Sequence, residues 1–524
     1  MENHHIRIFD TTMRDGEQAG HTMSISTKVS IAKWLERLRV DVIEAGFPIS
    51  SPAEITALRE ISKAISEPII CALAGVKQDH IEAAARSLEL AKKSRIHVFV
   101  STSDIHIRKK LRSTREEVLE AIYREVSRAK GYCEDVEFSA EDATRTNPKY
   151  LIKVIETAID AGATTINIPD TVGYAQVDSY GELIDTVWKC IPDNEKIILS
   201  VHCHDDLGLA VANSLNGVLY GADQVEGCFL GIGERAGNAA LEDVIMALHT
   251  RYDLYDVKTN IDISQLGPFF RFLSSAIGYP ISDHKSIAGR YAFTHSSGIH
   301  ADGVLKDRQT YEIMKPEDIN WQGAGVALVS HLGEAGLADH LKKMGYSDPT
   351  LASGILGEFK LLANSVGRLS DEDLHMLIQE HLSKEEVKDR ELFTFGQETI
   401  SFESENGENK GSILILKNSV IQRASALGDG PVDAVCKAID KALSAHGQEM
   451  DKKEVCFNFI HGSGGSEALG FARARVKLGD QVGYGRASSL NIVVAYAQAY
   501  LDAINHLIQV PVSEEKENLR KVFI

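Results

Sequence analysis

Two histidines separated by a single residue, His202 and His204, directly follow the apolar run Ile197–Val201. In a β-strand alternate side chains lie on one face, so the two imidazoles would point the same way. Neutral imidazoles placed side by side are good ligands for a divalent metal. The simpler interpretation is two polar residues where a strand becomes a loop, and the pair by itself leaves both interpretations open.

A metal on these histidines also needs a hard oxygen ligand, and Asp15 is the best carboxylate candidate. Two imidazoles, one carboxylate and open positions suit Mn, Mg, Fe or Zn. Such a site is a Lewis acid that can chelate a 2-keto acid through its carboxylate and carbonyl oxygens. Arg14, next to Asp15, could stabilise negative charge that develops on that carbonyl oxygen. The alternative is a salt bridge to Glu44 that only positions the loop, and both roles could hold together.

The elements that would position these residues lie in the first half of the chain. Eight short apolar runs alternate there with helical patterns, one of which opens at Ser51 with a capping box to Glu54 and continues through Ile65. This alternation over about 250 residues predicts a (β/α)8 TIM barrel. An open doubly wound sheet is the alternative, but no GxGxxG follows the first strand. The eight runs are Ile6–Phe9, Val42–Ala45, Ile69–Ala72, Ile96–Val100, Val136–Ser139, Thr165–Ile168, Ile197–Val201 and Gln224–Gly227.

The chemistry of such a barrel sits at the C-terminal ends of its strands. Polar residues follow most of the predicted strands there, and this convergence favours the metal interpretation. Each residue also has a structural interpretation: Asp206 could cap the next helix, and Asp10 and Asp170 could hold their own loops. The polar residues are Asp10, Arg14, Asp15, Glu17, Glu44, Ser101, Thr102, Ser103, Ser139, Glu141, Asp142, Asn167, Asp170, Thr171, His202, His204, Glu234, Arg235 and Asn238.

Two further stretches offer anion-binding chemistry. Gly231 and Gly233 of GIGERAGN resemble a phosphate-cradling loop, although they precede the eighth predicted helix and do not match the Walker pattern. The segment IRKKLRSTR at 107–115 carries five basic residues. We expect a solvated helix face there, and the alternative is contact with the phosphates of a nucleotide-like cofactor.

Composition and charge limit the partners. The formal net charge of −19 disfavours nucleic acid and anionic membranes, so an anionic substrate needs a local positive site. No apolar run approaches the roughly 20 residues of a membrane helix, and the N-terminus lacks an apolar signal-peptide core. The seven cysteines are scattered without a CxxC pair. We therefore expect a reduced, cytoplasmic protein.

The pattern changes after residue 255. Glycines and prolines interrupt short helical pieces up to about residue 390, a linker region that holds His295, His300 and Tyr311, and a lone histidine is more often structural than catalytic. Residues 391 to about 510 repeat a pattern of strands followed by a helix, without a candidate nucleophile or acid–base pair. This module is predicted to bind a ligand or to dimerise, and the charged tail from Pro511 is predicted to fray. The predicted domains are 1–270, 271–390 and 391–524.

With these stretches together, the chain resembles the 2-isopropylmalate synthase family of metal-dependent, TIM-barrel acyl-CoA-condensing enzymes. The resemblance covers nearly the whole length, although citramalate and homocitrate synthases share the barrel motifs. It rests on FDTTMRDGEQ, VIEAGFP, RIHVFVSTSDIH, VEFSAEDATR, TINIPDTVGY, SVHCHDDLGLAVANS, GIGERAGN, SSGIHADGV, RQTYEIM and GDGPVDAV.

The resemblance implies condensation of acetyl-CoA with 2-oxoisovalerate and thioester hydrolysis to 2-isopropylmalate and CoA. It also implies a homodimer or higher homo-oligomer, feedback inhibition by leucine, and Mn²⁺ or Mg²⁺ (with Zn²⁺ possible) as the metal, with K⁺ as a possible activator. The implied site residues are Asp15, His202, His204 and Asn238 for the metal; Arg14, Glu44, Glu141, His300 and Tyr311 for catalysis, the last two reaching a partner's barrel; Thr171, Ser139 and His97 for the keto acid; and Gly231, Gly233, Glu234 and Arg235 for the co-substrate.

The chain departs from the family pattern at three places. Gly75 stands where an arginine is expected after the third strand, residues 328–341 differ from the usual linker pattern, and the last repeat, GRASSLNIVVAYAQAYL, lacks acidic residues. The first two bear on substrate contacts and the third on leucine sensitivity. Two alternatives therefore stay open: a citramalate-type synthase that uses pyruvate or another keto acid, and a metal-binding sensor without catalysis.

Overall fold

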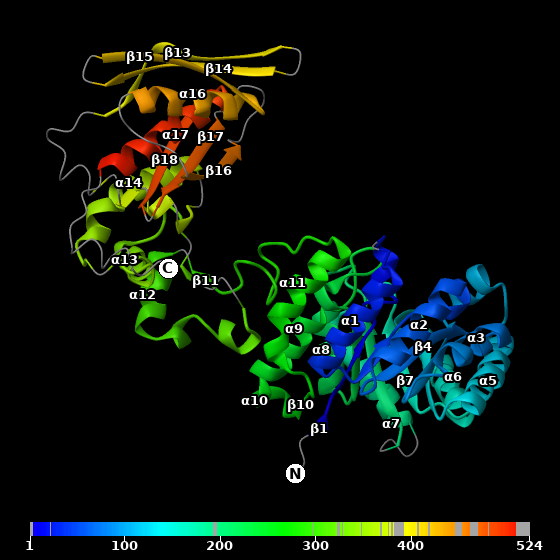
Figure 1. Cartoon of the computed structure of the whole chain (residues 1–524). Helices are drawn as coiled ribbons and strands as arrows, with labels where there is room; N and C mark the ends of the chain where they lie inside the picture. The colour runs from blue at the N-terminus through cyan, green and yellow to red at the C-terminus, as the bar shows by residue number, and fades with distance from the viewer. Residues whose placement is uncertain are drawn as a thin grey trace. The chain divides into compact units, whose positions relative to one another are not determined.

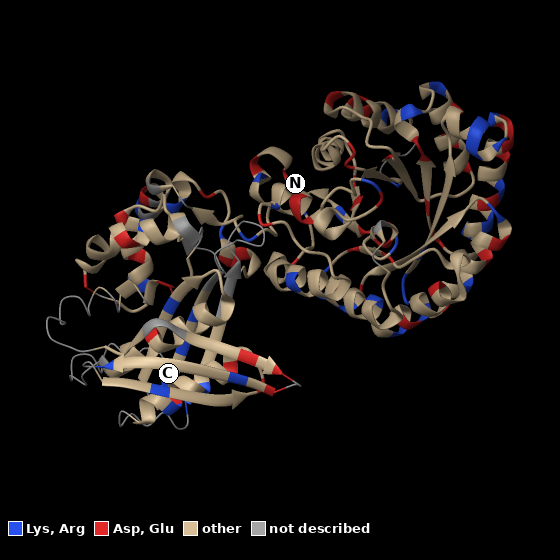
Figure 2. Ribbon diagram, turned by 90° about the horizontal axis from the view of Figure 1, so that it is seen from above, with Lys and Arg blue, Asp and Glu red and all other residues tan. Residues whose placement is uncertain are grey.

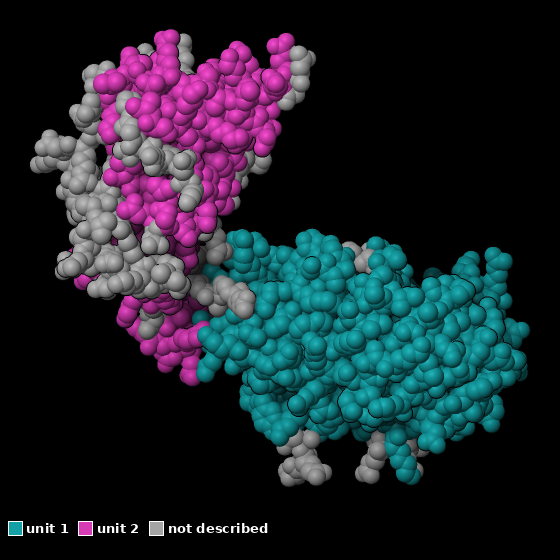
Figure 3. All heavy atoms as spheres, viewed as in Figure 1, with its two compact units in different colours: residues 1–294, 312–324 teal, residues 295–311, 325–524 magenta. Residues whose placement is uncertain are grey.

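The structure is a computed structural model, and the predicted tail from Pro511 lies outside the residues that it describes. Two compact units are found, a barrel unit of residues 1–294 and 312–324 and a second unit of residues 295–311 and 325–524 (Figure 3). No described helix is long and apolar enough to cross a bilayer. The described residues are 4–20, 22–191, 196–295, 297–321, 325–326, 328–346, 348–366, 369–371, 373–375, 377–378, 381, 392–405, 408–417, 420–445, 453–461, 470–479 and 481–509.

The barrel unit is a closed barrel of eight parallel strands surrounded by helices, which confirms the predicted fold (Figure 1). Each predicted apolar run overlaps one strand. The strands are β2 (Arg7–Asp10), β3 (Val42–Glu44), β4 (Ile69–Gly75), β5 (Ser94–Ser101), β6 (Asp135–Glu141), β7 (Thr165–Asp170), β8 (Ile198–Cys203) and β9 (Gln224–Gly227). The helices are α1 (Ile25–Leu38), α2 (Pro52–Ala64), α3 (Gln78–Leu88), α5 (Arg115–Tyr132), α6 (Pro148–Asp160), α7 (Val177–Cys190), α8 (Ala210–Leu219), α9 (Leu241–Thr250), α10 (Tyr252–Tyr255) and α11 (Leu266–Ile277).

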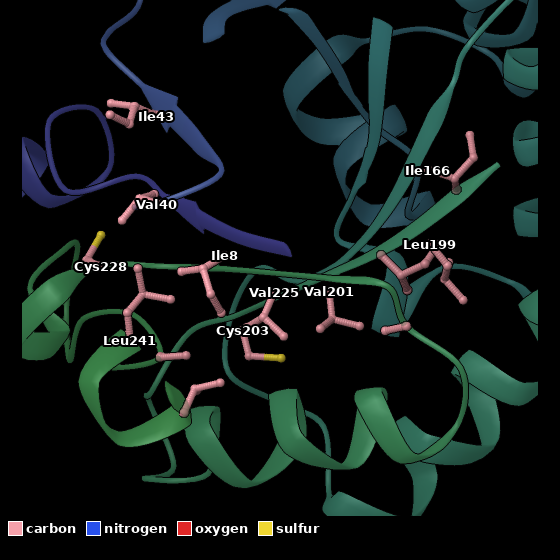
Figure 4. Packing of buried hydrophobic residues seen from close by; sticks show 14 of the residues in the cluster. Ile8, Val40, Ile43, Ile166, Leu199, Val201, Cys203, Val225, Cys228 and Leu241 are labelled. Carbon is pink, nitrogen blue, oxygen red and sulfur yellow. The ribbon is translucent and has the colours of Figure 1, made fainter. Parts of the chain in front are cut away.

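Apolar side chains from the strands pack beneath the helices. Ile8, Val201 and Val225 are fully buried in one cluster (Figure 4). Alternate strand positions point the other way, into the barrel, where buried polar residues replace the apolar ones. Charged positions of both signs alternate along the outer helices (Figure 2), as expected for surfaces that face water.

Three local features differ from the sequence expectations. Ser51 caps α2 by accepting from the Glu54 amide, but the Glu54 carboxylate binds Lys28 Nζ at 2.6 Å, so the capping box is half formed. The basic segment does not form a regular helix face, because α4 (Asp104–His106) runs into a π-helix, η3 (Ile107–Leu111), that ends at Arg112 with φ 52°. The two-residue strands β1 (His4–His5) and β10 (Val257–Lys258) form an additional parallel pair.

The second unit contains helices and a repeated βββα module. Both halves bury apolar residues in one shared core, which includes Ile413 and Ile439 of the first half and Val476 and Ile504 of the second. The helices are α12 (Gly298–Lys306), α13 (Glu334–Lys343) and α14 (Leu351–Val366). The repeats are β13 (Thr394–Glu405), β14 (Glu408–Lys417), β15 (Val420–Gly428) and α16 (Pro431–Ala445), then β16 (Lys453–His461), β17 (Gly470–Leu478), β18 (Gln481–Ser489) and α17 (Ile492–Gln509).

The third strand of each repeat was not expected from the sequence. Residues 485–491, predicted as the entrance of a helix, largely belong to β18, and α17 begins only at Ile492. The small residues there serve close packing, because a Cβ on Gly485 would lie 2.1 Å from the Ala499 carbonyl oxygen of α17. The predicted three-domain division stays a prediction, and α11 runs across its first boundary at 270/271.

Candidate active site

His202 lies in β8 and His204 directly follows the strand's last residue at the rim of the barrel, and the loop after β2 brings Asp15 to them. Asp15 Oδ2 lies 3.6 Å from His202 Nε2 and 3.8 Å from His204 Nε2, and the two Nε2 atoms are 3.3 Å apart. All three side chains are buried. The predicted metal ligands are therefore brought together, as a group that could hold an ion.

The hydrogen bonds of the two imidazoles decide which nitrogens could face a metal. His202 Nδ1 lies 3.1 Å from Glu226 Oε2; since a carboxylate only accepts, Nδ1 donates to it and Nε2 is the nitrogen that a metal would bind after displacing its proton. Burial lowers the pKa of His202, but Asp15 and Glu226 outweigh it and raise the value to about 9 in the metal-free protein. Burial and the neighbouring His202 lower the pKa of His204 to about 4, so His204 is a free base at neutral pH.

Unsatisfied buried oxygens strengthen the fit to a cation. Asp15 Oδ1 and Asn238 Oδ1 have no hydrogen-bond partner among the described residues. Asn238 forms a backbone bridge with His204, which places it beside the group. Burial tends to raise the pKa of Asp15, but Arg14 and the histidines hold it well below its usual value, so the carboxylate stays charged. A hard-oxygen and imidazole donor set with unpaired oxygens suits a divalent metal.

Arg14 is fixed by two carboxylates. Its Nε donates to Glu44 Oε2 at 2.5 Å, and its NH1 donates to Asp15 Oδ2 at 2.7 Å. Burial disfavours the charge, but Glu44 and Asp15 raise the pKa of Arg14 above its usual value. The predicted Arg14–Glu44 salt bridge is therefore present, and no described group pairs with the third guanidinium nitrogen.

A hydrogen-bonded chain crosses four strands behind Arg14. Glu44 is fully buried and accepts from His97 Nδ1 at 2.7 Å, while His97 Nε2 lies 2.6 Å from Ser139 Oγ. Asn167 Nδ2 donates to the same Ser139 oxygen at 2.8 Å. Ser139 Oγ thus joins Asn167 to His97. This row of hydrogen bonds holds His97 and Ser139, two predicted substrate contacts, in fixed orientations.

All of these residues except Glu44 and Asn238 line one pocket of about 290 Å³ in the barrel unit. Its wall is polar except for Leu73, Phe99 and Pro169. Glu141 accepts from Ser101 Oγ at 2.6 Å and from Lys110 Nζ at 2.5 Å. The lining residues are Arg14, Asp15, Gln18, Leu73, His97, Phe99, Lys110, Ser139, Glu141, Asn167, Pro169, Thr171, His202, His204, Glu226, Glu234 and Arg235.

The GIGERAGN loop folds back on itself at this pocket. Glu234 and Arg235 line it, and Arg235 donates to both oxygens of Asp206 at 2.8 Å and to the Thr171 carbonyl at 2.9 Å. Asp206 is therefore an ion-pair partner and does not cap the next helix. Gly233 allows the fold, because a Cβ there would lie 2.1 Å from Asn238 Nδ2. A co-substrate contact by Gly231 and Gly233 stays a prediction.

His300 and Tyr311 lie in the second unit. Their rings stack with centroids 4.2 Å apart at 27°, and Tyr311 is exposed. Their contact with a barrel stays a prediction. Gly75 ends β4, and its amide donates to His80 Nδ1 at 3.3 Å, so an imidazole occupies the space beside it.

Sequence reasoning missed Glu226 and the buried polar column beneath it. Glu226 pairs with His202 in the register of β8 and β9. Below it, Gln224 donates to Glu137, and Arg95 donates to both. A carboxylate inside an apolar strand, as in the run QVEG, is the signal that could have indicated Glu226.

Comparisons with known proteins match nearly the whole length of this chain to known families. Residues 5–271 match the HMGL-like family, 287–365 the homocitrate synthase post-HMGL domain-like family, and 368–508 the LeuA allosteric (dimerisation) domain. Two proteins named 2-isopropylmalate synthase, from Dechloromonas aromatica and Pelotomaculum thermopropionicum, are 42% and 43% identical to the chain. Each alignment covers 96% of this chain, with 97% and 98% of the relative.

The chain belongs to the 2-isopropylmalate synthase family. The resemblance found in the sequence is confirmed, as is the assignment to acetyl-CoA-condensing enzymes with a barrel and a C-terminal LeuA-type regulatory domain. A further relative from Nitrosospira multiformis is 43% identical over 96% of this chain and 97% of its own. Among solved structures, the HMG-CoA lyase of Bacillus subtilis covers 53% of this chain and 95% of its own, with a TM-score of 0.46 and 21% identity.

Proposed function

We propose that the barrel site condenses acetyl-CoA with 2-oxoisovalerate to form 2-isopropylmalate, with Mn²⁺ or Mg²⁺ held by Asp15, His202 and His204. The observation that carries this proposal is the buried group of these ligands with Arg14 in one pocket. The 2-isopropylmalate synthases that the chain resembles support the choice of substrate. A bound metal would supply Lewis-acid polarisation of the keto acid.

Arg14 would stabilise the charge that develops during condensation. Two of its nitrogens are held by Glu44 and Asp15, so the guanidinium plane is fixed and the third nitrogen is left to donate to the keto oxygen. A preorganised donor at the position of developing charge is worth more than the same donor in water. Thr171 would bind the keto-acid carboxylate, and Glu141 would position Lys110 and water.

The bond-forming step needs a base for acetyl-CoA. We assign proton removal from the acetyl methyl to His300 of the partner subunit, assisted by Tyr311 of the partner subunit. The enolate carbon then forms a bond with the keto carbon, and the carbonyl electron pair becomes an alkoxide beside Arg14. Water hydrolyses the thioester and releases 2-isopropylmalate and CoA.

The pocket wall favours a branched keto acid. Leu73, Phe99 and Pro169 offer apolar surface beside the polar groups, and the isopropyl group of 2-oxoisovalerate would remove that surface from water. The methyl group of pyruvate would cover less of it, so the citramalate-type reaction is the second candidate.

The remaining assignments follow the family. We propose that the chain acts as a cytoplasmic homodimer or higher homo-oligomer, that K⁺ can act as an activator, and that leucine binds the C-terminal module and inhibits. The match of residues 368–508 to the LeuA allosteric (dimerisation) domain supports the last assignment.

Thiol release from acetyl-CoA tests the proposal. The assay compares 2-oxoisovalerate with pyruvate in the presence of Mn²⁺ or Mg²⁺, with and without leucine. We expect preference for 2-oxoisovalerate and inhibition by leucine. Preference for pyruvate would make the enzyme a citramalate-type synthase, and no release with either keto acid would favour a non-catalytic sensor.

A further inference from the structure

Apart from Lys110, the basic segment after β5 has no role in the chemistry above. Arg108, Lys109, Lys110 and Arg112 are all exposed. Lys110 lines the pocket and donates to Glu141 at 2.5 Å. Its three basic neighbours lie outside the pocket lining, so the cationic surface begins at the pocket and continues beyond it.

The nearby acids are engaged elsewhere. Asp104 accepts from Arg115 at 2.9 Å through both oxygens, and Glu117 caps α5 by accepting from Ser113 and Thr114. Lys109 and Arg112 have no ion-pair partner among the described residues. Although the chain as a whole carries a net charge of −19, these neighbouring cations without paired acids repel one another. A bound anion would relieve this local repulsion.

The backbone fixes this cationic turn. Ile107 is 2% exposed and anchors it, and the Ser113 amide donates to the Ile107 carbonyl at 3.1 Å. The five-residue π-helix ends at Arg112 in the left-handed region, at φ 52°. Short π-helical segments and left-handed non-glycine residues are costly, and they occur often at functional sites.

We propose that Lys109 and Arg112, with Arg108, bind the phosphates of the 3′-phospho-ADP end of acetyl-CoA. This inference rests on the proposed function, because it requires an acyl-CoA whose thioester enters the pocket. The pantetheine arm separates the thioester from the phosphates, so the phosphate site must lie on the rim outside the pocket. These three residues are exposed and outside the pocket lining, and each stands within two positions of the lining residue Lys110.

The test compares two thioesters in a Lys109→Gln/Arg112→Gln double variant. Lys110 stays intact because it contacts Glu141. We expect the KM for acetyl-CoA to rise roughly tenfold, from two lost charge contacts, while kcat stays within about twofold. Acetyl-pantetheine lacks the nucleotide, so its kcat/KM should be the same in variant and wild type. The wild-type KM for acetyl-CoA should also rise more steeply with salt than that of the variant.

The matched control neutralises Lys92 and Lys93, two exposed lysines that precede β5 at the opposite end of the barrel. The Lys92→Gln/Lys93→Gln variant should keep the wild-type KM for acetyl-CoA. An unchanged KM in the Lys109→Gln/Arg112→Gln variant would overturn the proposal, and so would equal losses with acetyl-CoA and acetyl-pantetheine.

Direct binding separates this inference from the proposed function. If the wild-type enzyme turned over neither thioester, the proposed function would fail. Calorimetry with adenosine 3′,5′-bisphosphate would still measure whether the basic segment binds the nucleotide phosphates. Weaker binding by the Lys109→Gln/Arg112→Gln variant would support the phosphate site. Equal affinity in variant and wild type would overturn it.

Discussion

At the scale of single residues, Arg14 is the group on which the proposed chemistry depends most. It lies between Glu44 and Asp15, at 2.5 and 2.7 Å, and so links the candidate metal ligands to the hydrogen-bonded residues behind the pocket. Its planar fork fixes two hydrogen bonds and directs the remaining donor. A residue held in this way contributes geometry as well as charge.

Arg14→Ala should lower kcat by about 10²- to 10³-fold, as for the loss of one oxyanion donor. Arg14→Lys should recover only part of the loss, because an ammonium group cannot form the same fork. Arg59→Ala on α2 is the control, since Arg59 is an exposed partner of Glu89 and should leave turnover unchanged. Steady-state kinetics on folded protein measure the effect, and wild-type turnover in Arg14→Ala would remove the role assigned to Arg14.

Metal affinity should depend on pH through His202. The pKa of its imidazole is raised to about 9 in the metal-free protein, and a metal requires the free base. Below pH 9 each bound ion therefore displaces a proton, and affinity should rise about tenfold per pH unit. His204, with a pKa of about 4, adds no proton release near neutrality. Calorimetric titration of the apoprotein with Mn²⁺ at several pH values measures this, and a pH-independent affinity between about pH 6.5 and 8.5 would be the contrary result.

The grouping of the candidate metal ligands could be predicted from the sequence because local rules fix it. Alternation along a strand places His202 and His204 on one face, and barrel topology brings Asp15 to the same rim. Glu226 could not be found in this way, since its contact with His202 depends on the register of β8 against β9. Interstrand register is a property of the whole barrel.

At the scale of elements, a buried lysine connects the loop of Arg14 and Asp15 to two helices. Lys28 of α1 is 1% exposed, and its Nζ lies 2.6 Å from Glu17 and 2.6 Å from Glu54. Glu54 also accepts from the Phe47 amide after β3. The lysine thereby ties the loops after β2 and β3 together.

Lys28→Met should destabilise the protein by about 2–4 kcal/mol, because two partly buried carboxylates lose the cation that they share. Lys28→Met/Glu17→Gln/Glu54→Gln should recover much of that stability, since no buried charge is left unpaired. Lys33→Met is the control, as Lys33 is exposed on the same helix. Chemical denaturation measures these differences. Equal stability of Lys28→Met and Lys33→Met would show that the ion pairs of Lys28 do not contribute to stability.

Element boundaries could be predicted where the hydrophobic periodicity was regular. The prediction failed where packing between elements determined the boundary. All eight barrel strands fall on predicted apolar runs. The β18 strand was missed because Gly483 and Gly485 weaken its pattern, and they are present to let α17 pack closely on the strand. The π-helix at Ile107–Leu111 has no periodic signal of its own.

At the scale of the whole molecule, the second unit connects residues 373–375 to the repeat module through side-chain contacts. Asp373 and Arg473 of β17 form an ion pair at 2.6 Å, with side chains 3% and 17% exposed. His375 stacks on Tyr484 of β18 at 5.9 Å and contacts the Tyr346 hydroxyl at 2.5 Å. A ligand that shifts β17 or β18 would therefore also act on Asp373 and His375.

Asp373→Asn should weaken leucine inhibition by about fivefold or more and leave turnover without leucine unchanged, because it breaks this connection and touches no barrel residue. Asp371→Asn is the control, since Asp371 is exposed and contacts only His340 among the described residues. Inhibition curves on both variants provide the measurement. A wild-type leucine response in Asp373→Asn would show that the ion pair does not transmit the signal.

The most direct test of the central claim follows the carbon–carbon bond. Metal-loaded enzyme is given 2-oxoisovalerate and acetyl-CoA labelled with ¹³C in the acetyl group, and the products are quantified by NMR together with free CoA. We predict labelled 2-isopropylmalate and CoA in equal amounts, and neither product after removal of the metal by a chelator. Release of CoA with labelled acetate in place of 2-isopropylmalate would contradict the account, because the site would then hydrolyse a thioester without condensation.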